Sequence, residues 1–213
     1  MVKTRIIQSA QGAHAYPLLI KSLLLSGGRS HPEREIVYAD KLRYDYRTLK
    51  QRIHRLANML TAAGVMPGDT VALLDWDSHR ALECFFAVPM IGAVLHTVNV
   101  RFSADQIAYN LVLVHDDFLP VVESLAETLT TVRGYIQLSD EESKATSLPV
   151  LGEYETLLAA AGELFDFPDF DENSIATLFY TTGTTGNPKG VYFSHRQLVL
   201  HTLNELGLLA AHE

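Results

Sequence analysis

The sequence contains very little cysteine, since Cys84 is the single one in 213 residues. One cysteine cannot form an internal disulfide, so a small disulfide-built fold is excluded. Cys84 lies in the apolar stretch ALECFFAV, where we expect a buried, unreactive side chain in a reducing compartment. The chain also lacks any apolar run near the roughly 20 residues that span a bilayer, and its start lacks the apolar core of a secretion signal. These absences favour a soluble cytoplasmic protein without a transmembrane segment.

An excess of positive charge is also absent, because 25 acidic residues outnumber 17 basic ones and give a formal charge of -8. The chain therefore shows no basic face of the kind that binds nucleic acid. The negative charge is concentrated in residues 139–173, which hold ten carboxylates and only one basic residue, Lys144. We interpret this segment as a solvated connection within one α/β domain (1–213), between a first portion (1–138) and a final portion (174–213).

Apolar periodicity predicts alternating strands and helices through the first portion. Asp45 is placed to cap a helix that stops at Gly64, and Ser78 is placed to cap a second helix. Strands are expected at TVALL and at AVLHTV, before and after that second helix. Strand, helix and strand with short connections imply a right-handed crossover and parallel pairing. The predicted fold class is therefore α/β, an open, mostly parallel layered sheet with flanking helices.

Other elements are less regular. A helix from Pro17 to Leu25 is expected to end at a glycine pair, and residues 35–46 are expected to form a β-hairpin. A helix opening at Ser103 leads into the strand LVLVHDD with only Asn110 between them, although such loops usually take about 2 to 6 residues. Either the chain carries a deletion at this point or residues are missing from the sequence.

The most informative stretch follows the acidic connection. The apolar run from Ile175 to Tyr180 predicts a buried strand, which breaks into a loop from Thr181 to Gly190. This loop holds four threonines, three glycines and one lysine. Such a composition is found in ordinary surface turns, but glycines also let successive amides converge on an anion, so the loop is a candidate phosphate cradle. It is not the G-x-x-x-x-G-K-[ST] loop, because Pro188 stands where the second glycine is required.

The residues after the loop predict a short strand, VYF, and a last helix that Ser194 and Gln197 open with a capping box. His195 begins this helix, where the helix dipole disfavours its protonated form, and we expect a structural role for it. A second polar group lies at the end of a predicted strand, where a site could form, but turn and capping roles are favoured for its members, His96, Asn99 and Arg101.

The stretch YTTGTTGNPKGV, followed by SH, resembles the phosphate loop of the AMP-forming adenylating enzymes. That superfamily includes acyl-CoA synthetases, peptide-synthetase adenylation domains and insect luciferases. The commonest form of its motif carries Ser where this chain has Thr182, and the hydroxyl is kept. The segments YDYRTLKQRIHRLANML and PGDTVALLDWDS also resemble early parts of the family, and HTVNVRF is most similar to the branch that acts on fatty and methylthio acids.

The resemblance implies the incomplete N-terminal domain of an enzyme that activates a carboxylic acid with ATP and passes the acyl group to coenzyme A. It implies ATP, Mg²⁺ and coenzyme A as ligands, with Thr181 as the candidate to help hold Mg²⁺ and Lys189 as the candidate catalytic residue. The implied phosphate-binding residues are Thr181, Thr182, Gly183, Thr184, Thr185, Gly186 and Lys189.

Downstream parts of that family lie beyond residue 213, so the isolated chain is expected to make no thioester. The alternative hypothesis is a catalytically incompetent fragment that binds nucleotide or serves as an interaction module. A third hypothesis is a luciferase-like or peptide-synthetase relative. An incomplete sheet would leave an apolar edge uncovered, which favours association and allows a homo-oligomer.

Overall fold

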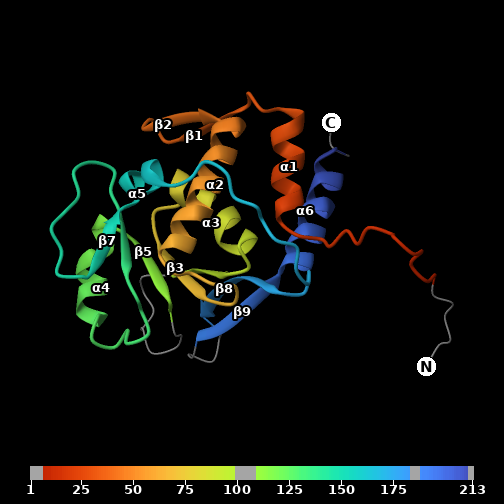
Figure 1. Cartoon of the computed structure of the whole chain (residues 1–213). Coiled ribbons are helices and arrows are strands. Elements are labelled where there is room, and N and C mark those ends of the chain that lie inside the picture. The colour runs from red at the N-terminus through yellow and green to blue at the C-terminus, as the bar shows by residue number, and fades with distance from the viewer. Residues whose placement is uncertain (1–6, 99–108, 183–187, 211–213) are drawn as a thin grey trace.

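The computed structural model describes residues 7–98, 109–182 and 188–210 (Figure 1). Within this part, a two-stranded sheet pairs β1 with β2, and a seven-stranded sheet has the order β7-β6-β5-β3-β4-β8-β9. Neighbours in the larger sheet are parallel except β8 and β9, which are antiparallel. The predicted open, mostly parallel α/β sheet is therefore confirmed. The strands are β1 (Glu35–Tyr38), β2 (Leu42–Asp45), β3 (Thr70–Leu74), β4 (Val94–Thr97), β5 (Leu111–His115), β6 (Tyr135–Leu138), β7 (Val150–Glu153), β8 (Ile175–Thr182) and β9 (Pro188–Ser194).

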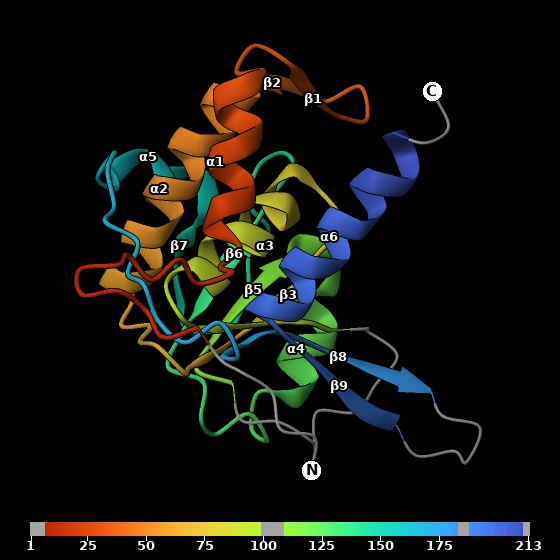
Figure 2. The same ribbon diagram turned by 90° about the vertical axis from the view of Figure 1, so that its right-hand side faces the viewer.

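Helices cover the two faces of the larger sheet (Figures 1 and 2). Alternate strand residues point to opposite faces, so Val71 and Leu73 join one apolar core while Ala72 and Leu74 join the other. The first core contains side chains of α1, α2, α3 and α5, and the second contains those of α4. The helices are α1 (Lys21–Ser30), α2 (Tyr46–Ala62), α3 (His79–Met90), α4 (Leu119–Leu125), α5 (Tyr154–Ala160) and α6 (His195–Ala210).

Local signals place several of these elements correctly. Asp45 caps α2 by accepting a hydrogen bond from the amide of Thr48, and Ser78 caps α3 by accepting one from the amide of Arg80. The predicted hairpin is the β1–β2 pair, and the predicted parallel pairing is seen between β3 and β4. Cys84 lies on α3 and is completely buried, as expected.

The first helix was predicted in the wrong place. It spans Lys21–Ser30 rather than Pro17 to Leu25, and it continues through the glycine pair. The residues before it are held by distant partners, because the amide of Leu18 donates to Glu172 at 2.7 Å and that of Ile20 donates to His195 Nδ1 at 3.3 Å. These long-range bonds fix Leu18 outside the helix.

The short connection at Asn110 is stabilised by β3. Tyr109 is not helical, contrary to the expectation, and Asn110 lies outside both helix and strand, as expected; residues 103–108 of the predicted helix lie outside the described residues. Asn110 exchanges two bonds with Thr70: its amide donates to the carbonyl oxygen, and its side-chain oxygen accepts from the amide. These bonds hold the chain against β3 at the point where it enters β5.

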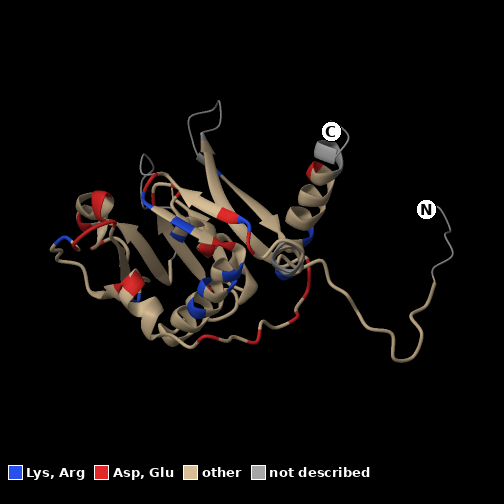
Figure 3. Cartoon of the chain, turned by 90° about the horizontal axis from the view of Figure 1, so that it is seen from above, with Lys and Arg blue, Asp and Glu red and all other residues tan. Residues whose placement is uncertain are grey.

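The acidic segment is not a simple solvated connection. It contains strand β7, which the sequence analysis missed, and α5. Its later part, residues 162–172, is called here the acidic strap, and it runs past helices that carry basic side chains (Figure 3). Lys21 pairs with Asp169 at 2.7 Å, and Arg55 pairs with Glu163 at 2.7 Å. These two carboxylates therefore pair with cations that lie far away in sequence.

No helix in the described part of the chain combines the length and apolar character needed to cross a membrane.

Candidate functional site

The predicted phosphate loop lies at the tip of a β-hairpin. Thr181 pairs with Lys189 and Thr182 pairs with Pro188, so both strands extend further than predicted. The loop is therefore shorter than the predicted Thr181 to Gly190. Threonine favours the extended backbone, which explains why these residues join the ladder. Four predicted residues at the tip, Gly183, Thr184, Thr185 and Gly186, lie outside the described residues and stay predictions.

Thr181 and Lys189 are direct cross-strand partners, and both are exposed. Residues opposite one another in an antiparallel pair point to the same face, with Cβ atoms about 5 Å apart. The hairpin therefore presents a hydroxyl and an ammonium group side by side. An exposed phosphate chain could accept hydrogen bonds from both groups, and the ammonium would offset its negative charge.

The hairpin projects from the carboxyl edge of the parallel sheet (Figure 2). Its base is anchored at α6, where the Ser194 amide donates to Gln197 Oε1 at 2.9 Å and the Gln197 amide donates to Ser194 Oγ at 3.3 Å. The predicted capping box is thus confirmed. Arg196 pairs with Glu172 of the acidic strap, and the same carboxylate holds the amide of Leu18.

His195 has the structural role that was expected. It is completely buried and its Nδ1 accepts from the Ile20 amide, while the ring of Phe170 packs edge-on against it. Burial lowers the pKa of His195 to about 4, so the ring is neutral near pH 7. His96 is also buried, and burial lowers its pKa to about 4. Asn99 and Arg101 lie outside the described residues.

A pocket of about 330 Å³ opens at the same edge of the sheet, beside the carboxyl ends of β3 and β4. Ligands of open α/β sheets bind in this type of position. The pocket combines two carboxylates with apolar and aromatic groups; its lining residues are Leu73, Asp75, Asp77, Ala81, Phe85, Thr97 and Val98.

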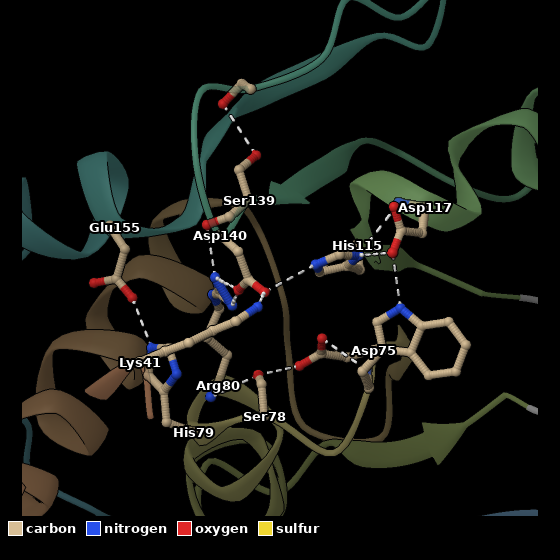
Figure 4. A network of polar contacts seen from close by, with 12 residues as sticks. Lys41, Asp75, Ser78, His79, Arg80, His115, Asp117, Ser139, Asp140 and Glu155 are labelled. Atoms are coloured by element: carbon tan, nitrogen blue, oxygen red, sulfur yellow. Dashed lines mark hydrogen bonds and ion pairs between the residues drawn. The ribbon is translucent and has the colours of Figure 1, made fainter. Parts of the chain in front are cut away.

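A polar network at the carboxyl ends of β3, β5 and β6 was missed by the sequence analysis (Figure 4). Arg80 is 2% exposed and donates to Asp140 Oδ1 at 3.0 and 2.8 Å and to the Ser139 carbonyl at 2.6 Å. Lys41, from the turn of the β1–β2 hairpin, donates to Asp140 Oδ2 at 2.6 Å. His115 Nε2 lies 3.7 Å from the same oxygen. The network fixes the sheet edge and the small hairpin relative to each other.

A second network is buried among the helices. Glu83 on α3 is fully buried and accepts hydrogen bonds from Tyr44, Arg52 and Tyr154. Arg52 also forms a bidentate ion pair with Glu155. Burial alone would raise the pKa of Glu155, but hydrogen bonds from His79 and Arg52 lower it to about 2. No spacing rule could have identified this set, because its members come from β2, α2, α3 and α5.

The described residues contain no group of three His, Cys, Asp or Glu side chains placed to hold a metal ion. Magnesium usually keeps several waters and substrate oxygens and takes few ligands from the protein. The exposed hydroxyl of Thr181, beside Lys189, fits such a contact to a phosphate-bound ion.

Curated proteins similar to this chain include several acyl-CoA ligases. A medium-chain-fatty-acid–CoA ligase from Ectopseudomonas oleovorans is 36% identical over 87% of this chain and 36% of its own length. A 3-methylmercaptopropionyl-CoA ligase from Ruegeria pomeroyi is 38% identical over 87% of this chain and 37% of its own length. A long-chain-fatty-acid–CoA ligase from Thermus thermophilus is 42% identical over 76% of this chain and 30% of its own length. The chain thus spans about a third of the length of these relatives.

Solved structures share the fold. An anthranilate CoA ligase in complex with anthranoyl-AMP matches 84% of this chain and 35% of its own with a TM-score of 0.75 at 20% identity. A long-chain-fatty-acid-CoA ligase from Archaeoglobus fulgidus matches 92% of this chain and 41% of its own with a TM-score of 0.75 at 17% identity. The family model described as AMP-binding enzyme matches residues 26–209, and this chain therefore belongs to the AMP-binding enzyme family.

Proposed function

We propose that this chain forms the ATP-binding N-terminal part of an AMP-forming acid:CoA ligase that activates a fatty or other apolar carboxylic acid. The observation that carries the proposal is the pairing of exposed Thr181 with exposed Lys189 at the base of the YTTGTTGNPKGV loop. The relatives named as ligases of medium-chain, long-chain and methylmercapto acids support an apolar acid.

The reaction brings together two anions, a carboxylate and a triphosphate. A carboxylate oxygen attacks the α-phosphorus, the bond from that phosphorus to the bridging oxygen breaks, and pyrophosphate leaves. In this chain Lys189 and Thr181 would hold the β- and γ-phosphates, so that positive charge and fixed donors lie on the leaving group without blocking the line of attack. Transfer of the acyl group to the thiol of coenzyme A then releases AMP.

Thr181 is the residue proposed to contact Mg²⁺, and Thr182, Gly183, Thr184, Thr185 and Gly186 are proposed to complete the phosphate cradle. When bound, Mg²⁺ would supply further charge neutralisation on the phosphates. The proposal includes a cytoplasmic location, which was expected from the lack of a long apolar run and of a secretion signal in the sequence. The relatives are about three times longer than the matched segment, so the proposal assigns no thioester formation to these 213 residues alone.

Two measurements test the proposal. Calorimetry of the chain with Mg²⁺ and ATP is expected to show one binding site, and replacing Lys189→Ala is expected to weaken binding at least 10-fold. Lys50→Ala is the matched control, because Lys50 is an exposed lysine on α2. Binding that is equally strong in the Lys189→Ala variant would refute the site.

The second measurement is pyrophosphate release by the isolated chain over a panel of acids. Binding of ATP without turnover favours the reading as a nucleotide-binding fragment of such an enzyme. Turnover would refute that fragment reading, and the preferred acid would separate a fatty-acid ligase from an amino-acid-activating or luciferase-like relative.

A further inference from the structure

The hairpin that carries Thr181 and Lys189 is attached to the parallel sheet over a short distance. The register between β4 and β8 consists of two pairs, Leu95 with Thr177 and His96 with Leu178. Strand β8 continues to Thr182, and its residues after Leu178 pair with β9 on the other side. Among the described residues, the β4 ladder therefore does not reach the outer half of the hairpin, and the contacts there are made by side chains.

His96 provides a side-chain contact of this kind. Its ring contacts two tyrosine rings: Tyr109 is stacked on it at a centroid distance of 5.5 Å and an interplanar angle of 26°, and Tyr180 is tilted against it at 5.5 Å and 54°. His96 is 3% exposed and Tyr109 is 8% exposed, so these two stacked rings are held in place by burial. Tyr180 lies two residues beyond the last β4–β8 pair and packs against the His96 ring.

Tyr180 also reaches across to the other strand of the hairpin. It pairs with Gly190, and a Cβ atom at residue 190 would lie 3.4 Å from the Tyr180 ring. The glycine thus leaves room for the ring beside Lys189. A continuous line of contacts runs from Tyr109 through His96 and Tyr180 to the β9 strand.

The protonation state of His96 suits a packing role. Burial keeps the ring neutral near pH 7, and its buried Nδ1 has no hydrogen-bond partner among the residues that the structure describes. A histidine used for proton transfer would need a path to a ligand, whereas this ring is 3% exposed and packs against two tyrosine rings. The His96 ring therefore acts on the hairpin through aromatic packing against Tyr180, and not through acid–base chemistry.

We propose that His96 is a positioning residue which, through Tyr109 and Tyr180, sets the direction of the β8–β9 hairpin and so places Thr181 and Lys189 for a triphosphate. The claim that His96 helps to place the triphosphate-binding residues rests on the proposed function. The claim that His96 orients the hairpin rests only on its contacts with Tyr109 and Tyr180. Neither ring nitrogen takes part in the proposed chemistry.

The test is hydrogen–deuterium exchange of the whole chain, read at the amides of residues 179–182 and 189–191 and, for comparison, in β5. His96→Ala is expected to speed exchange in the hairpin by about 10-fold or more while β5 is unchanged, and His96→Phe is expected to keep exchange within twofold of the wild type. His54→Ala is the matched control, because His54 packs against Phe167 on another part of the molecule. Tyr180→Ala is a second variant that should also fold, since Tyr180 is only partly buried.

Each outcome decides the proposal. Faster exchange confined to the hairpin in His96→Ala and Tyr180→Ala supports it, and a matching 10-fold loss of Mg²⁺–ATP affinity, restored in His96→Phe, supports the role toward phosphate. The proposal is overturned if exchange in the hairpin is unchanged. It is also overturned if the exchange rate rises equally in β5, because that would indicate a general loss of stability. If the wild-type chain binds no ATP, the proposed function fails and the exchange data alone decide the role of His96.

Discussion

Arg80 and Asp140 form a buried ion pair in which two guanidinium nitrogens share one carboxylate oxygen. Removing Asp140 would leave a charge that is 2% exposed with the Ser139 carbonyl as its remaining partner. We predict that Asp140→Ala lowers the free energy of unfolding by about 3 kcal/mol, because breaking a buried pair leaves a charge uncompensated. Urea denaturation measures this loss.

The neighbouring Glu141 offers a control for that prediction. It is exposed, and Glu141→Ala is expected to change the free energy of unfolding by no more than about 0.5 kcal/mol. Equal effects of the two substitutions would show that the Arg80 pair adds little to stability.

The buried histidines predict how stability depends on pH. The pKa values of His96 and His195 are lowered from 6.5 to about 4 in the folded chain. Between these values the unfolded state binds more protons, so stability falls as pH falls from 6.5 toward 4. The slope is at most about 1.4 kcal/mol per pH unit for each histidine. Urea denaturation at a series of pH values measures this slope, and His96→Phe should remove the part of it that comes from His96. An unaltered slope would contradict the lowered pKa of His96.

Lys189 is predicted to act on the rate more than on folding. In a full-length enzyme that contains this segment, Lys189→Ala should lower pyrophosphate release by on the order of 100- to 1000-fold, as the loss of one preorganised donor does elsewhere. Thermal unfolding should be unchanged, because the side chain is exposed. An unaffected rate would count heavily against the assignment of this residue.

An apolar surface on β9 and α6 predicts self-association. Tyr192, Leu200, Leu203 and Leu206 are each between 44 and 56% exposed, and β9 is an edge strand. The leucines recur every three residues along α6, so they share one side of the helix. Leu203→Lys should lower the weight-average mass measured by sedimentation equilibrium. Leu164→Lys, at an exposed leucine of the acidic strap, should leave it unchanged; a wild-type chain that is strictly monomeric would contradict the prediction.

Much of the fold could be predicted because its signals are local. The caps Asp45 and Ser78 and the capping box at Ser194 act within three residues, and each is confirmed. The apolar runs of β3 and β5 are long enough to identify buried strands. These features depend on neighbours in sequence, so a single chain without structural information reveals them.

The errors occur where partners are far apart. The position of α1 depends on Glu172 and His195, and the acidic strap depends on Lys21 and Arg55, none of which a local pattern could connect. Strand β7 was missed because it is short, follows Pro149 and contains Gly152, which has a positive φ of 158°. The motif located the hairpin tip, but the antiparallel ladder that brings Thr181 opposite Lys189 could only be seen in three dimensions.

The bonds of Leu18 and Ile20 have a consequence for how the protein is made. Their acceptors lie 154 and 175 residues later in the chain. At a synthesis rate of roughly 5 to 20 residues per second, the ribosome needs about 10 to 35 s to deliver His195 after Ile20 has been added. Helix α1 can pack on α2 and α3 early, but the two bonds that hold the residues before it form only after nearly the last part of this segment has left the ribosome.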